Sequence, residues 1–145
     1  MSLFSALSVS ASGLSAQRAR AQVLVENLAN AETTRTSEGG PYRRKDVVFQ
    51  SETVGESFGS VLSASLQPAG TGVSVAGIMV DDRPPEKRYI PGHPDADKDG
   101  YVAFPKVNPA EDMVDLMGAS RSYQANVAAM SAVKDMIQRS IDLLR

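Results

Sequence analysis

One short loop holds the residues of this sequence that are best suited to chemistry. Asp95, Asp97 and Asp99 alternate ahead of a glycine, as they do at the start of a calcium-binding loop. The match fails further along, because the twelfth position is Lys106, where such a loop needs a bidentate Glu. We therefore expect a solvated acidic turn, and the alternative is a calcium- or ligand-binding module centred on residues 91–102.

The single histidine lies in the same loop. His93 is followed by Pro94 and Asp95, and a histidine beside a carboxylate can act as a general base. The neighbouring sequence supplies no suitable nucleophile or oxyanion hole, so we expect a structural role and a noncatalytic protein. The loop residues that we single out are Pro91, Gly92, His93, Pro94, Asp95, Asp97, Gly100 and Tyr101.

The composition excludes several other classes of site. The chain of 145 residues has no cysteine and one histidine, which removes disulfides, thiolate catalysis, cysteine-based zinc sites and multi-histidine metal sites. Its 15 basic and 17 acidic residues give a net charge of −2, so no basic excess favours nucleic acid or anionic lipid. We expect no cofactor, no metal, no nucleic acid and no small-molecule substrate.

The N-terminal segment does not have the pattern of a leader or an anchor. Its first charged residue is Arg18, and serines interrupt the apolar residues before it, whereas a secretory signal begins with basic residues. No run approaches the ~20 apolar residues of a membrane helix. We interpret the segment as mature structure, with no cleaved signal peptide and no membrane span.

A C-terminal helix over residues 109–145 is strongly indicated. Asn108 can cap its start, Pro109 suits the first helical position, and Glu111 completes a capping box. Apolar residues then recur with the heptad spacing of a coiled-coil seam. The main series is Leu116, Tyr123, Met130, Ile137 and Leu144, and its companions are Met113, Val127 and Ile141, with Ser120 and Lys134 as exceptions.

The same helix carries a second apolar stripe, which we name the outer stripe. A helix that is apolar on more than one face is usually surrounded. We infer that other subunits cover it, and the alternative is a compact monomer whose helices fold over a sheet. The outer stripe consists of Val114, Met117, Ala125, Ala128, Ala132, Met136 and Leu143.

A weaker helix is expected over residues 1–32. Leu7, Leu14, Ala21 and Leu28 keep a seven-residue spacing, but Gly13 and several serines lower the intrinsic helicity, so the helix needs partners. Near its end, Asn27 and Asn30 lie one turn apart, where their amides can bond backbone as the chain turns out. The alternative is that Asn30 only ends the helix.

The middle of the chain, residues 33–108, is rich in glycine and proline and is expected to be a small β-rich outer domain. Residues 52–72 are expected to be mobile. A basic cluster at residues 43–45 is expected to face solvent or an acidic neighbour. The fold class is thus α+β, with terminal helices that pair as a coiled-coil core. The expected strands are residues 44–49, 73–80, 89–90 and 101–104.

Several segments resemble the bacterial flagellar rod and hook proteins. The N-terminal residues 10–18 and 27–34 and the C-terminal residues 107–127 are similar to the signatures that these axial proteins share. Residues 39–44 and 91–102 resemble the proximal type within the flagellar basal-body rod family. The resemblance covers nearly the whole chain.

The resemblance implies a structural subunit that assembles through its terminal helices into the axial drive shaft, which transmits torque and is a conduit for export. It implies flagellar type III export without signal cleavage, and a place in the basal body in the periplasm. The implied partners are other rod subunits and further copies, with the basal ring and the export gate as further candidates. A different axial subunit of the same flagellum is the alternative.

Overall fold

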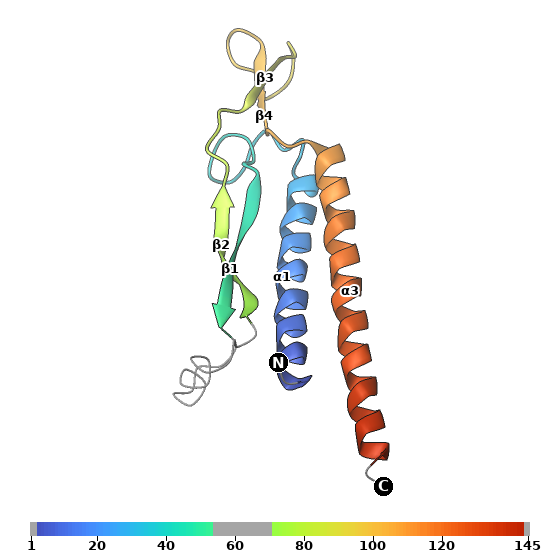
Figure 1. Cartoon of the computed structure of the whole chain (residues 1–145). Helices are drawn as coiled ribbons and strands as arrows, with labels where there is room; N and C mark the ends of the chain where they lie inside the picture. Colours follow the sequence, from blue (N-terminus) through green and yellow to red (C-terminus); the bar gives the residue numbers. More distant parts are fainter. Residues whose placement is uncertain (1–2, 54–70, 144–145) are drawn as a thin grey trace.

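The computed structural model describes residues 3–53 and 71–143, so residues 1–2, 54–70 and 144–145 lie outside the description. The described elements are two helices and two small antiparallel sheets, which confirms the α+β class (Figure 1). In chain order they are α1 (Leu3–Ala29), β1 (Lys45–Thr53), β2 (Thr71–Val80), β3 (Glu86–Tyr89), β4 (Tyr101–Phe104) and α3 (Pro109–Asp142).

The helix α1 lies between α3 and the hairpin of β1 and β2 (Figure 1). The two helices run in opposite directions, so that α1 begins and α3 ends at the same end of the molecule, and β3 and β4 lie beyond the other end. The middle segment is therefore divided, with β1 and β2 alongside α1 and with β3 and β4 beyond the end of the helices. Buried residues on two faces of α1, Val23 and Leu24 among them, explain why the hairpin packs alongside it.

Small residues bring α1 and α3 together. A Cβ added to Gly13 would lie 3.1 Å from Nδ2 of Asn126, which is a tight approach. Ala16 on α1 and Ala119 on α3 are both buried. Close contact between the helices therefore depends on side chains that are small.

Within the chain, the seam that the sequence predicted for α3 is only partly covered. Leu116, Met130 and Ile137 are half-buried, whereas Tyr123 is exposed. The companion residues Met113, Val127 and Ile141 are exposed, and Leu144 lies outside the described residues. The residues that are buried or half-buried beside this series lie one position before the predicted companions in each heptad. Their side chains are small enough to let α1 and α3 approach closely. These residues are Asp112, Ala119, Asn126 and Val133.

The predicted apolar series of α1 is only partly buried within the chain. Leu7, Leu14 and Leu28 are each half-buried. The buried residues of α1 are Ala16, Val23, Leu24 and Asn27. The seven-residue spacing of the leucines thus marks a flank of the buried face.

The strands were predicted close to where they lie. β1 pairs with β2 from Lys45 opposite Val80 to Thr53 opposite Thr71, with an irregularity after Val48. The predicted mobile segment 52–72 begins and ends in these strands, and most of it lies outside the described residues. β3 begins three residues before the predicted strand at residues 89–90, and β4 matches its prediction.

Neither of the two described helices combines the length and apolar character that a bilayer crossing requires.

Candidate assembly interface

A buried asparagine joins the end of α1 to the start of β1. Asn27 is 0% exposed, and its Nδ2 donates to the carbonyl oxygen of Lys45 at 2.8 Å. Its Oδ1 accepts from the backbone N–H of Lys45 and from the hydroxyl of Tyr42, each at 2.9 Å. The side-chain amide thus pairs with β1 as a neighbouring strand would. The sequence predicted that the amide of Asn27 bonds to backbone. It does so, and the backbone that it reaches belongs to Lys45, 18 residues further along the chain.

Asn30 bonds locally. Its Nδ2 donates to the carbonyl oxygen of Glu26 at 2.9 Å, and its Oδ1 accepts from the hydroxyl of Thr33 at 3.2 Å. These bonds hold the turn that follows α1.

An ion pair joins the residue just before β1 to the start of α3. Arg44 Nη2 donates to Oδ1 of Asp112 at 2.8 Å, and the carboxylate of Asp112 is buried. Its Oδ2 has no hydrogen-bond partner among the described residues. Burial alone would lower the pKa of Arg44, but the hydrogen bond to Asp112 and the nearby acidic charges outweigh it and raise that pKa. We call Asn27, Tyr42, Arg44, Lys45 and Asp112 the junction.

The rest of the basic cluster also meets acids. Arg43 pairs with Asp82 at the surface at 3.2 Å, and Lys45 pairs with Glu26. The predicted acidic neighbours are therefore confirmed. The partnership of Arg44 with Asp112 was missed, because the two residues lie 68 positions apart and no local pattern connects them.

Tyr42 gives the junction a measurable pH dependence. Burial, followed by the charges of Glu26 and Asp112, raises the pKa of Tyr42 to about 12. Between the ordinary pKa of about 10 and this value, the unfolded chain loses the phenolic proton and the folded chain keeps it. The free energy of unfolding should therefore fall by up to about 3 kcal/mol as the pH rises through this window.

Urea denaturation between pH 9 and pH 12 measures this fall, with Tyr42→Phe as the control. The variant lacks the ionisable group, so its unfolding free energy should decline less steeply over the same range. Equal slopes for the two proteins would contradict the buried position of Tyr42.

The start of α3 has the predicted asparagine cap and the predicted proline. Oδ1 of Asn108 accepts from the N–H of Ala110 at 3.2 Å, and Pro109 occupies the beginning of the helix. This cap sets the position of Asp112, one turn further on.

The acidic loop is closed by its own carboxylates. Oδ1 of Asp97 accepts from the N–H groups of Asp99 and Tyr101, at 3.0 and 2.8 Å. Oδ2 of Asp95 accepts from the hydroxyl of Thr34 at 2.7 Å, and Arg35 pairs with the same carboxylate. These oxygens therefore serve as turn and docking contacts that tie the loop to the segment after α1.

The other loop residues shape the turn. His93 Nδ1 accepts from the N–H of Asp95 at 3.1 Å. Gly100 has a φ of +82°, and a Cβ there would lie 2.9 Å from the ring of Tyr89. That ring meets Tyr101 edge-to-face, with centroids 5.3 Å apart. Gly92 also has a positive φ, and Pro91 and Pro94 are exposed. Over residues 3–53 and 71–143, no three acidic or histidine side chains gather as a metal site would require.

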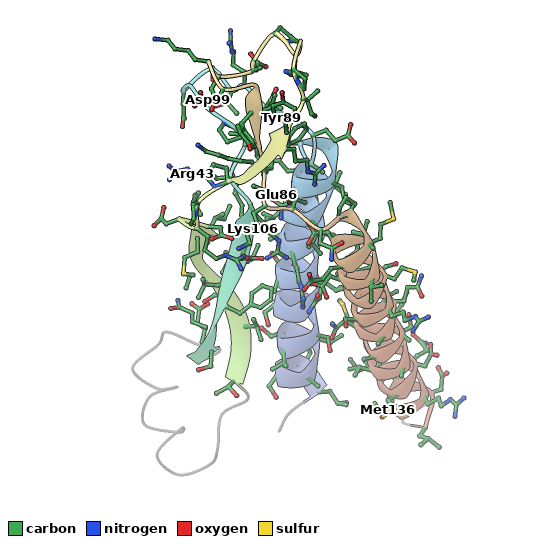
Figure 2. The ribbon with its side chains drawn as sticks, turned by 90° about the horizontal axis from the view of Figure 1, so that it is seen from above. Arg43, Glu86, Tyr89, Asp99, Lys106 and Met136 are labelled. Atoms are coloured by element: carbon green, nitrogen blue, oxygen red, sulfur yellow. The ribbon has the colours of Figure 1, made fainter. Side chains whose placement is uncertain are left out.

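An open groove of about 510 Å³ lies beside the junction, between β3 and the start of α3. Figure 2 labels two residues of its lining, Glu86 and Lys106. Within the lining, Arg88 pairs with Glu86, and Arg83 pairs with Asp81 nearby. The groove therefore has a salt-bridged wall of both charge signs.

The outer stripe of α3 faces away from α1. All seven of its residues are exposed within the chain, from Val114 to Leu143. Figure 2 shows one of them, Met136, near the far end of α3. The chain therefore presents an apolar helix face along nearly the full length of its longest element.

The chain is similar to named proteins over nearly its whole length. It is 46% identical to the flagellar basal-body rod protein FlgC of Bacillus subtilis (strain 168), with 99% of each chain covered. The FlgC proteins of Borreliella burgdorferi and Salmonella typhimurium are 40% and 38% identical, with 98% or more of each chain covered. The chain belongs to the FlgC family of flagellar basal-body rod proteins. Residues 98–143 also match the family model described as the flagellar basal body rod FlgEFG protein C-terminal.

Membership of the FlgC family confirms the resemblance of the sequence to the flagellar basal-body rod proteins. The FlgEFG match covers the end of the acidic loop, β4 and α3. The segment with the outer stripe thus lies within the part of this chain that matches the FlgEFG model.

Proposed function

We propose that the chain is a noncatalytic structural subunit of the flagellar basal-body rod, in which neighbouring subunits cover the outer stripe of α3. The observation that carries the proposal is the exposure of that whole stripe, together with membership of the FlgC family. The paired α1 and α3 serve as a coiled-coil-type core, and residues 33–108 make lateral contacts.

The energetics favour association. Burying a valine, leucine or methionine side chain stabilises a complex by about 1.5–3 kcal/mol. Val114, Met117, Met136 and Leu143 supply four such side chains, and the alanines between them let another helix approach closely. Several copies of this contact around a rod would act together.

A second exposed flank of α3 is proposed as a lateral contact. It comprises residues that the sequence assigned to the seam and that α1 leaves uncovered, namely Met113, Tyr123, Val127 and Ile141. Because contacts then lie on more than one side of α3, torque would pass through many helix faces.

Membership of the FlgC family supports a finer assignment. We place the chain in the proximal rod, within an axial shaft that transmits torque and is a conduit for export. It would reach the periplasm through the flagellar type III apparatus without cleavage. Other rod subunits and further copies are the proposed neighbours, and the basal ring and export gate are further candidates.

Substitution in the outer stripe tests the proposal. Ala128→Glu puts a charge in the middle of the stripe, and it should reduce the amount of the chain in purified basal bodies at least about tenfold, because a buried unpaired charge is strongly unfavourable. Both Ala128 and Ser122 are exposed, so a glutamate at either position should not alter the unfolding of the free chain.

Ser122→Glu is the matched control. It adds the same charge to the same helix on the flank that already carries Asp115, away from the outer stripe and from the second exposed flank, and it should enter basal bodies at half the wild-type level or more. Wild-type incorporation of the Ala128 variant would overturn the proposal.

A further inference from the structure

One edge of β2 lacks the charges and prolines that normally protect a strand. β2 spans ten residues, Thr71–Val80, without a charge or a proline. Its other edge is paired with β1. Exposed edges in soluble proteins are usually blocked by charges, prolines or a covering element, because unpaired backbone groups accept any suitable strand.

The backbone groups at this edge point outward. The N–H and C=O of Lys45 bond to Asn27, so they point away from β2, and the pair of Lys45 with Val80 is of the non-hydrogen-bonded kind. The pattern alternates, so Val47 and Ile78 form another such pair. The N–H and C=O of Ile78 and Val80 therefore lie on the free side of β2.

The free side is open at one end only. Toward the start of β2, Ser12 of α1 accepts from the N–H of Val73 at 3.1 Å. At the other end, the side chains of Ile78, Met79 and Val80 are 56%, 64% and 46% exposed. No hydrogen bond from the described part of the chain reaches the outward amides of Ile78 and Val80. The chemistry that fits this edge is an extended backbone with uncharged side chains.

Among the described strands, β2 itself is the best match to that requirement. β1 carries Lys45, Asp46 and Glu52, and three of the four residues of β3 are charged. β4 has only four residues, and its Val102 is fully buried. An antiparallel pair of identical edges sets each outward N–H against an outward C=O, and no like charges oppose the approach.

We propose that two copies of the chain associate through their β2 edges, with residues 78–80 of each copy at the centre of a four-stranded sheet. Such a contact uses the same surface on both copies, so it closes at two. It is therefore a dimer of the free subunit, separate from the outer-stripe contacts, and it opens when the subunit joins a polymer.

Sedimentation and amide exchange on the full chain test this dimer. Sedimentation velocity should show a monomer that becomes a dimer as the protein concentration rises. In NMR hydrogen exchange, the amides of Ile78 and Val80 should be unprotected at low concentration and should slow about tenfold or more when most chains are paired.

Matched charge substitutions locate the contact. Ile78→Lys puts a charge at the open edge and should keep the chain monomeric, with the unfolding curve of the wild type. Val48→Lys adds the same charge to β1, whose Val48 backbone is paired with Gly77, and should still dimerise.

Three results would overturn the proposal. If the chain stays monomeric at every concentration, the proposed dimer does not form. If a dimer forms but the amides of Ile78 and Val80 exchange fast, the contact lies elsewhere. Slow exchange at every concentration would show that the edge is covered within one copy. None of these results bears on incorporation of the Ala128 variant into basal bodies, so this test and that of the rod function fail separately.

Discussion

Replacing Arg44 with methionine should lower the free energy of unfolding by about 3–5 kcal/mol. The substitution removes the only charged partner that the described residues offer the buried carboxylate of Asp112, and an uncompensated buried charge has a cost of that size. Such a loss is a large share of the stability of a typical domain. Urea denaturation of the full chain at neutral pH measures it.

The neighbouring Arg43 supplies the matched control. Its side chain is 65% exposed and that of its partner Asp82 is 90% exposed, so Arg43→Met should cost about 1 kcal/mol or less. Combining Arg44→Met with Asp112→Leu should recover much of the lost stability, because no buried charge is then left alone. Equal losses for the Arg43 and Arg44 variants would show that Asp112 is solvated.

Asn27→Ala should lower the free energy of unfolding by about 3 kcal/mol. Three hydrogen bonds end on this side chain, and the change leaves the backbone of Lys45 and the hydroxyl of Tyr42 without their buried partner. Each unsatisfied buried group costs about 1–3 kcal/mol, and water that enters the space offsets part of the sum. Chemical denaturation measures the change in unfolding free energy.

Asn30→Ala is the control for this effect. Asn30 is of the same residue type, one turn away, and its bonds are local and half-buried, so the loss should be about 1 kcal/mol. A more damaging change at Asn30 than at Asn27 would contradict the role of Asn27 as the link between α1 and β1.

The type and approximate position of the elements could be predicted because their signals are local. Asn108 and Pro109 define the start of α3 by themselves, and the β-branched residues of β2 mark a strand without help from distant parts. The exposure of the outer stripe also follows from a local pattern, since the spacing of Val114, Met117 and Ala128 puts them on one helix face.

The register of α1 against α3 could not be predicted from apolar spacing. Gly13 and Asn126 set how closely the helices approach, and neither residue has the hydrophobicity that marks a seam. The partner of Asp112 lies 68 residues away in the sequence. The position of the hairpin likewise depends on α1, because Ser12 and Asn27 bond to its two strands.

The central claim is that neighbouring subunits cover the outer stripe, and hydroxyl-radical footprinting of its methionines tests it most directly. Met117 and Met136 are 54% and 48% exposed in the single chain. Mass spectrometry should find both readily oxidised in the free protein and protected in purified basal bodies. Equal oxidation of the two residues in both preparations would contradict the claim.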